Sequence, residues 1–175
     1  MTFYARLFAL FGMMWLASCT GVPDGIVPVQ SFSLKPYLGV WHEIARLDHS
    51  FERGLTQISA TYSLNEDGSV KVLNRGWDVA QGKWKEAQGR AVFVGPSDQG
   101  RLKVSFFGPF YGAYNVIEYD PTRYTMICGP DRSYFWILSR EPRLDQATLD
   151  RLIQRARSLG FETDKLIFPA ESAKK

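Results

Sequence analysis

Short runs rich in Val, Ile, Tyr, Phe and Trp recur from position 39 onward, with turn residues between them. Regularly spaced runs of this kind predict β-strands rather than helices. The connections carry suitable chemistry, for example Asn-Glu-Asp-Gly at residues 65–68 and Gln-Gly at residues 81–82. Connections this short join consecutive strands in antiparallel order. Eight strands are predicted, at residues 40–47, 58–64, 70–77, 84–94, 102–107, 113–119, 124–128 and 134–139.

Eight consecutive antiparallel strands leave two unpaired edges unless the sheet closes on itself. Closure at eight strands gives an interior that holds side chains or one small ligand. We therefore predict an all-β fold, an eight-stranded up-and-down barrel. One amphipathic helix follows, beginning after Asp145 and ending near Gly160, and we expect it to pack outside the barrel. Residues 166–168 are predicted to add a short edge strand.

The N-terminus has the order of features found in bacterial lipoprotein signals. Arg6 precedes a ten-residue apolar stretch, and Ala17 and Ser18 lead directly to Cys19. That stretch is about half the length that a membrane-spanning helix needs, so it reads as a signal core. An ordinary secretory signal is the alternative. We expect cleavage before Cys19 and lipid on its sulfur, and because Thr20 is not Asp, an outer-membrane destination.

The predicted organisation is a signal peptide at residues 1–18, a tether at 19–35, one domain at 36–169 and a tail at 170–175. Gly and Pro in the tether favour an extended spacer that holds the domain off the membrane. The formal net charge of +3 includes Lys174 and Lys175 at the very end, so no basic face for nucleic acid is expected. With Cys19 acylated, Cys128 has no disulfide partner and is expected to be a buried, inert thiol.

Three motifs occur in order and resemble the lipocalin signature. Gly39 and Trp41 match the Gly-x-Trp of the first strand; residues 116–120, which end in Asp120, resemble the second motif; and residues 136–140, which end in Arg140, match the third. Residues 37–46, 51–54, 103–112 and 128–131 are similar to the bacterial (Blc) lipocalins, which are related to apolipoprotein D. This resemblance implies a lipocalin barrel in which Arg140 lies across Trp41 at the closed end.

Alternation along the strands, with Trp41 and Arg140 taken as inward, predicts which side chains face the interior. This set is mostly aromatic and aliphatic, which suits an apolar ligand site. The alternative is a barrel that side chains fill completely. The resemblance implies fatty acids or lysophospholipids as ligands. The predicted ligand-binding residues are Tyr62, Asn74, Ala91, Phe93, Val104, Phe106, Asn115, Ile117, Tyr134, Trp136 and Leu138.

Two other classes of function stay open, a lipid-modifying enzyme and a structural envelope protein. Nucleophilic catalysis needs a nucleophile beside a base, yet the only histidines are His42, predicted to point outward, and His49, near a loop. The sequence has neither a Gly-x-Ser-x-Gly motif nor a metal-spaced cluster, so we expect no catalytic residues, no metal and no cofactor. A homodimer remains an open alternative, and the aromatic segment at residues 106–112 is predicted to be a packed hairpin, part of the barrel mouth or a partner surface.

Overall fold

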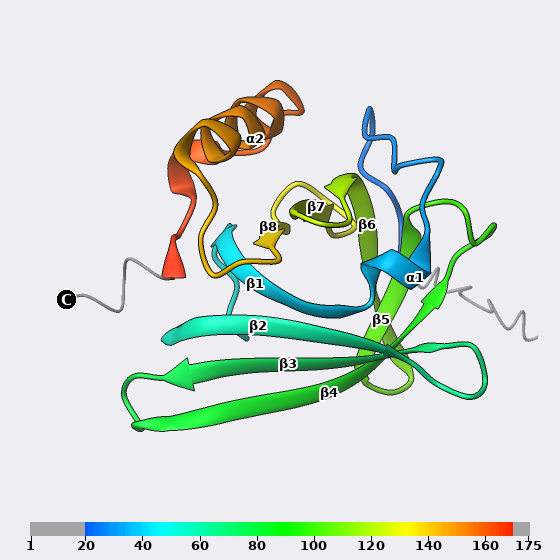
Figure 1. Cartoon of the computed structure of the whole chain (residues 1–175), viewed down its shortest axis with the longest axis horizontal. Coiled ribbons are helices and arrows are strands. Elements are labelled where there is room, and N and C mark those ends of the chain that lie inside the picture. The colour runs from blue at the N-terminus through cyan, green and yellow to red at the C-terminus, as the bar shows by residue number, and fades with distance from the viewer. Residues whose placement is uncertain (1–19, 170–175) are drawn as a thin grey trace, which may run out of the picture.

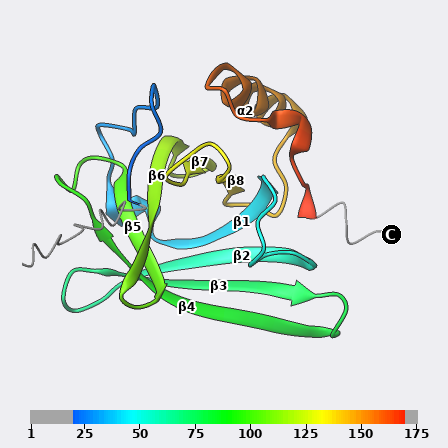
Figure 2. The same ribbon diagram turned by 180° about the vertical axis from the view of Figure 1, so that it is seen from behind.

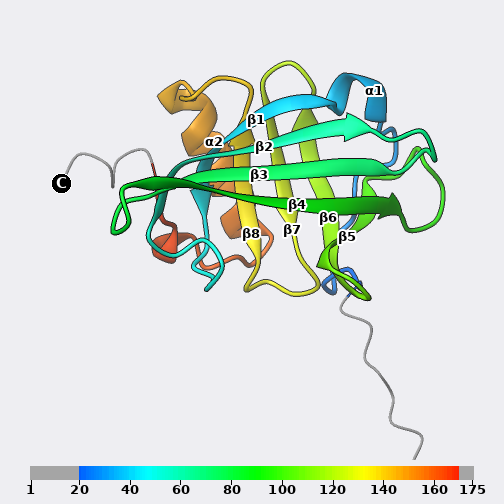
Figure 3. The ribbon, with the colours of Figure 1, turned by 90° about the horizontal axis from the view of Figure 1, so that it is seen from below.

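The computed structural model describes residues 20–169, and its main element is a closed barrel of eight antiparallel strands in sequence order, as predicted (Figure 1). Figure 3 shows the first four strands crossing the last four at a steep angle, as in an orthogonally packed barrel. The strands are β1 (Gly39–Arg46), β2 (Leu55–Leu64), β3 (Val70–Asp78), β4 (Lys83–Phe93), β5 (Arg101–Phe107), β6 (Phe110–Asp120), β7 (Tyr124–Cys128) and β8 (Phe135–Ser139).

Several strands are longer than the hydrophobic pattern predicts. β2 starts at Leu55 rather than at residue 58, and its pairing with β3 shifts register between Thr56 and Ser59. Gln57 lies at this shift with a φ of 49°. A bulge of this kind inserts an extra residue and interrupts the alternation of side chains. Because the alternation is interrupted here, the sequence pattern does not identify residues 55–57 as part of the strand.

The barrel closes between β1 and β8, which lie side by side when the molecule is viewed from behind (Figure 2). Helix α2 (Gln146–Ser158) covers the outside at this seam. Asp145 caps it as predicted, accepting a hydrogen bond from the Thr148 amide at 2.9 Å. The chain leaves the helix through Gly160, whose φ of 84° suits glycine.

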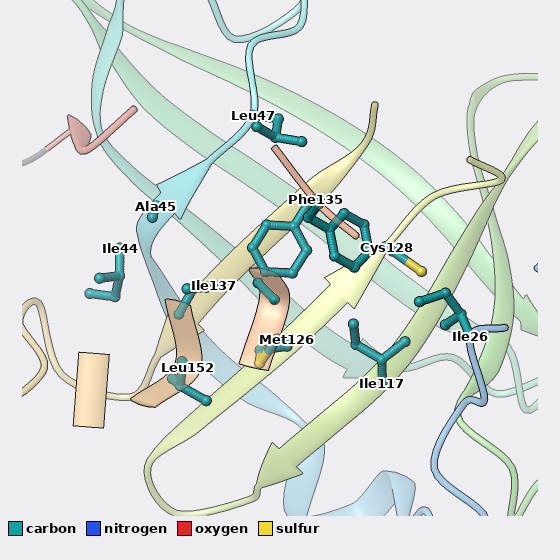
Figure 4. Packing of buried hydrophobic residues seen from close by; sticks show 12 residues of the cluster. Ile26, Ile44, Ala45, Leu47, Ile117, Met126, Cys128, Phe135, Ile137 and Leu152 are labelled. Carbon is teal, nitrogen blue, oxygen red and sulfur yellow. The ribbon is translucent and has the colours of Figure 1, made fainter. Parts of the chain in front are cut away.

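An outer core joins α2 to the barrel wall (Figure 4). Leu152 on the helix is fully buried and packs in one cluster with Ile44, Met126 and Ile137 on the strands. Cys128 lies in the same cluster, and burial raises the pKa of its thiol to about 12. A thiol held protonated in this way is unreactive, as expected for a structural cysteine.

The final strand predicted at residues 166–168 is reduced to one bridge. Ile167 exchanges two backbone hydrogen bonds with Arg46, of 3.0 and 2.8 Å. β1 pairs with β2 only as far as His42, so that edge of Arg46 is free for Ile167. Ile167 is the one residue of the predicted strand that pairs with β1. Among residues 20–169, no helix is long and apolar enough to cross a membrane.

The segment before the barrel differs from the extended spacer that its composition suggests. The Val29 amide donates to the Val116 carbonyl at 2.9 Å, and the Gly100 amide donates to the Val29 carbonyl at 2.8 Å. A Cβ on Gly100 would stand only 2.7 Å from the Val29 side chain, so this close approach needs glycine. Ile26 and Phe32 are buried. A short helix that the sequence did not predict, α1 (Leu34–Tyr37), then leads into β1.

Candidate functional site

The interior of the barrel holds a cavity of about 120 Å³ that is partly open to solvent. Its wall is mainly apolar, with tyrosine hydroxyls and carboxyl groups among the few polar groups that line it. The barrel is therefore not filled completely by its own side chains. The apolar lining residues are Phe32, Leu34, Phe51, Ile58, Ala60, Val70, Val72, Ala91, Leu102, Val104, Phe106, Ala113, Ile127, Trp136 and Leu138.

Most of the residues predicted to face the interior do line this cavity. They come from five of the eight strands, so the alternation rule identified the inner face correctly over most of the barrel. Gly89 shows how tightly the wall is built at one point, because a Cβ there would stand 2.8 Å from the Phe106 ring. The predicted residues that line the cavity are Tyr62, Asn74, Ala91, Val104, Phe106, Trp136 and Leu138.

The interior placement predicted for Asn115 and Ile117 is wrong. Ile117 belongs to the outer core beneath α2 (Figure 4). Asn115 is buried outside the barrel, where its amide donates to the carbonyls of Gly21 at 3.0 Å and Gly129 at 3.1 Å. The inner face of β6 is instead formed by Tyr114 and Val116. The second motif, residues 116–120, lies on this strand but does not indicate which of its side chains turn inward, so the alternation was counted one residue out.

Phe93 and Tyr134 also lie outside the cavity lining. Phe93 packs edge-on against Phe32, with ring centroids 6.1 Å apart, where the N-terminal segment covers the barrel end. Tyr134 lies one residue before β8, and its ring stacks on Trp136 at 6.3 Å and on His49 at 5.9 Å. The surroundings of both rings include residues outside the strands, Phe32 and His49, and the pattern of a strand does not predict where such segments pack.

The closed end is organised around Trp41, which is fully buried. Its indole N–H donates to the Tyr37 carbonyl at 2.8 Å, and the Arg140 guanidinium lies 3.7 Å above the ring centroid. Arg140 also donates to the carbonyls of Pro121 and Val40, each at 2.9 Å, and to that of Pro36. The cation-π contact and these hydrogen bonds tie β1, the β6–β7 turn and α1 together.

Two further signature residues shape the backbone at this end. Gly39 has a φ of 97°, and a Cβ there would stand 3.5 Å from a guanidinium nitrogen of Arg140. Asp120 accepts hydrogen bonds from the Thr122 hydroxyl at 2.7 Å and the Thr122 amide at 2.9 Å, and these bonds lower the pKa of its carboxyl. Asp120 therefore fixes the turn that presents the Pro121 carbonyl to Arg140.

A hydroxyl network lies against the cavity near this closed end. The Tyr114 hydroxyl is 2.6 Å from that of Tyr37 and 2.8 Å from that of Tyr62. Burial raises the pKa of Tyr37 to about 12 and raises those of Tyr62 and Tyr114 well above their usual value. These groups stay neutral at physiological pH. Sequence reasoning found Tyr62 but missed Tyr114, because it placed the neighbouring Asn115 inside.

Charged groups line the cavity nearer its open mouth. Arg46 donates to Glu43 Oε1 at 2.6 Å, and the Trp136 indole donates to Glu52 Oε2 at 3.1 Å. His49 Nδ1 lies 3.0 Å from the same Glu52 oxygen. Burial, and the negative charge of Glu52, raise the pKa of Glu43 to about 8. Sequence reasoning named neither carboxylate, although Glu43 stands two residues after the inward Trp41 and so shares its face.

The two histidines, the candidate bases, lie in different surroundings. The His49 ring is buried between Phe51, at a centroid distance of 4.4 Å, and Trp136, at 4.6 Å. His42 lies on β1 with its backbone paired to Ser59 and Ser139. Among the residues that the structure describes, no group of His, Cys, Asp and Glu side chains could hold a metal ion. An apolar wall that carries a few polar groups is the usual lining of a site for a hydrophobic ligand.

Comparison with known proteins agrees with this architecture. The sequence model of the lipocalin-like domain family matches residues 32–171. The chain belongs to the lipocalin family. Its similarity extends to the bacterial branch: it is 48% identical to the outer membrane lipoprotein Blc of Vibrio cholerae over 164 residues, covering 93% of this chain and 96% of the relative. The Escherichia coli K12 protein of the same name is 48% identical over 83% of each chain.

More distant lipocalins share the fold. Temperature-induced lipocalin-1 of Arabidopsis thaliana is 35% identical over 79% of this chain and 78% of the relative. The solved structure of insecticyanin from the tobacco hornworm superposes with a TM-score of 0.70 at 23% identity, covering 85% of this lipocalin and 86% of that chain. The second comparison supports the barrel topology alone.

Proposed function

We propose that this lipocalin binds one single-chain lipid, a fatty acid or a lysophospholipid, in its barrel and stores or carries it in the cell envelope. The observation that carries the proposal is the distribution of polarity in the cavity, an apolar wall with tyrosine hydroxyls near the closed end and charged groups near the mouth. An acyl chain is a class of molecule that matches an apolar cavity open to solvent. At about 25 cal/mol per Å² of apolar surface, its burial supports micromolar or tighter affinity.

The proposed location is the outer membrane, through lipid on Cys19, which lies outside the described residues. The relatives named outer membrane lipoprotein support this location, as does the order of the signal features. Attached acyl chains hold a protein at a membrane durably when more than one is present. This location places the barrel beside its source of ligand.

The charged groups at the mouth favour a lysophospholipid over a fatty acid. Glu43 and Glu52 both line the cavity there, against one guanidinium, that of Arg46. The carboxylate of a fatty acid would meet the Glu52 carboxylate at this position, and above about pH 8 that of Glu43 as well, whereas an ethanolamine head group offers an ammonium ion. The aromatic faces of Phe51 and Trp136 in the same region also suit a cation. We therefore place the head group at the mouth and the acyl chain beneath it.

Fluorescence titration of the delipidated full chain tests this function. Lysophosphatidylethanolamine should change tryptophan emission and saturate near one ligand per barrel. Trp136→Phe should reduce both the signal and the affinity because it removes the indole N–H held by Glu52. Trp84→Phe is the matched control, since Trp84 lies outside the cavity lining and is partly exposed.

Changing the ligand tests the head-group assignment. Lysophosphatidic acid has the same acyl chain and phosphate without the ammonium group, and we expect it and a fatty acid to bind more weakly than lysophosphatidylethanolamine. Equal affinity for all three would refute the role given to Glu43 and Glu52. Flat titrations with every lipid, on protein that is folded and free of lipid, would refute the binding function itself.

A further inference from the structure

The rim of the open end presents large apolar side chains to solvent. Phe107 and Phe110, at the tip of the β5–β6 hairpin, are 82% and 78% exposed, and Phe51 in the β1–β2 connection is 59% exposed. Val79, after β3, is exposed as well. Exposed aromatic residues gathered at one end of a soluble fold mark a surface that meets another apolar phase.

The hairpin that carries the two phenylalanines has the composition of a membrane-contacting loop. Residues 106–112 read Phe-Phe-Gly-Pro-Phe-Tyr-Gly and contain no charged side chain. Lys103 lies just behind, with its ammonium group 4.8 Å from the centroid of the Tyr111 ring. An apolar tip with a cation behind it matches the layering of a bilayer surface, where anionic phosphates lie above the acyl chains.

The described chain starts at this same end of the molecule. The Asn115 amide donates hydrogen bonds to the Gly21 carbonyl and to the Gly129 carbonyl of the β7–β8 connection. Arg132 in that connection donates to the Asp24 carbonyl at 2.6 Å. Figure 3 shows the dark blue start of the described chain beside the β5–β6 hairpin and the β7–β8 connection. The point from which the chain leads to Cys19 is therefore on the open side.

The connection to the proposed lipid anchor is short. Only Thr20 stands between Gly21 and Cys19 in the sequence. Two residues span at most about 7 Å even when fully extended. The residues expected to act as a spacer are packed on the barrel instead, Ile26 and Phe32 among them. An anchor on Cys19 would thus hold the protein at its open side, close to the head groups.

We propose that the open end of the barrel rests on the membrane that holds the anchor, with Phe107 and Phe110 inserted among the lipid head groups, so that ligand passes directly between the leaflet and the cavity. This inference rests on the proposed lipidation and lipid binding. Insertion removes the two rings from water and orients the mouth toward the bilayer. A lysophospholipid can then enter the barrel without crossing the aqueous phase.

The rate of loading from a membrane tests this arrangement. The lipidated full chain would be placed in vesicles of phosphatidylethanolamine and phosphatidylglycerol that contain a fluorescent lysophosphatidylethanolamine. We expect the double variant Phe107→Ser and Phe110→Ser to load about tenfold more slowly than the parent protein. The control, Val40→Ser with Leu64→Ser, changes two exposed apolar residues away from this rim and should load at the parental rate. Equal rates for the two double variants would overturn the proposal.

A depth measurement separates this inference from the binding function. With Cys19 acylated and Cys128 buried, Phe110→Cys and Leu64→Cys each offer one reactive thiol for a spin label. On vesicles, the label at position 110 should collide more with oxygen dissolved in the bilayer, and the label at 64 more with an aqueous nickel complex. This result is expected even if the barrel binds no lysophospholipid. Aqueous exposure at both positions would overturn the proposal.

One further outcome of the depth measurement, and one further variant, test the proposal. If a second copy of the chain covers the hairpin, the label at position 110 should show spin–spin broadening without enhanced collision with oxygen, which also overturns the proposal. Cys19→Ala tests the anchor by itself, because vesicle flotation should be lost or strongly weakened. Flotation unchanged in that variant would show that Cys19 does not hold the protein and would remove the short tether on which the orientation depends.

Discussion

The two ends of this barrel are built from different chemistry. At the closed end, Trp41 is buried under the Arg140 guanidinium, and the tyrosine hydroxyls beside it are neutral and hydrogen-bonded. At the open end, buried carboxylates share one arginine, while phenylalanine rings project into solvent. At the closed end, these polar groups form their hydrogen bonds within the chain itself. The open end leaves apolar surface and charge for something outside the chain.

This difference assigns stability to one end and function to the other. Groups that are fully satisfied within the fold contribute mainly to folding, and their loss exposes buried polar atoms. Groups left unpaired or exposed in a folded protein are more often there for a ligand or partner. Substitutions at the closed end should therefore change the free energy of unfolding. Substitutions at the rim should change binding or membrane contact.

The largest effect is expected at the closed end. Trp41→Ala should lower the free energy of unfolding by about 3 to 5 kcal/mol, since it leaves a cavity where the ring lay. Arg140→Ala should also destabilise the protein, because carbonyls of β1, α1 and the β6–β7 turn lose their donor. Denaturant titration of both single variants and the double variant measures their coupling, expected at about 0.5 to 2 kcal/mol. Strict additivity would show that the contact of guanidinium and ring contributes nothing.

The open end should instead be sensitive to pH. The pKa of Glu43 is raised to about 8, from an ordinary value of 4.5, by burial and by Glu52, with Arg46 and His49 the other ionisable groups nearby. The folded protein therefore holds a proton that the unfolded chain has already released. Stability should fall as pH rises from about 4.5 to 8, by up to about 1.4 kcal/mol per pH unit, and level off above.

Glu43→Gln should flatten this decline, because the amide cannot release the proton. Urea denaturation at several pH values makes the measurement, with Tyr37→Phe as the control from the closed end. The tyrosine does not titrate in this range, since its pKa is raised to about 12. An equally steep decline in the Glu43→Gln variant would move the origin of the pH dependence to another group.

The closed end was also the more predictable from the sequence. Gly39, Trp41 and Arg140 occur in recognisable motifs, and the resemblance to lipocalins implied the contact of Arg140 with Trp41 that the structure shows. Strand number, α2 and its Asp145 cap were predicted because each depends on local pattern. The phase of β6 was not, because no motif fixed which of its faces turns inward. An error of one residue moved Asn115 and Ile117 to the wrong side.

Features that depend on long-range docking were beyond a sequence pattern. The cluster of Glu43, Arg46 and Glu52 forms only because the β1–β2 connection folds back over the mouth. The packing of residues 20–33 depends on contacts with Val116 and Asp98, far along the chain. Gly and Pro in that segment are equally compatible with a free spacer and with a docked one. Short-range composition therefore could not distinguish the two.

The smallest expected change in stability is at the rim, in the double variant Phe107→Ser and Phe110→Ser. Both rings are mostly exposed, so their removal takes little apolar surface from the folded state, and the free energy of unfolding should stay within about 0.5 kcal/mol of the parent value. Denaturant titration in solution makes the measurement, and affinity for lysophosphatidylethanolamine in solution should also be unchanged. A loss of several kcal/mol would mean that the hairpin is part of the folding core. The two ends would then not divide stability from function, and the slower loading expected from membranes would need another cause.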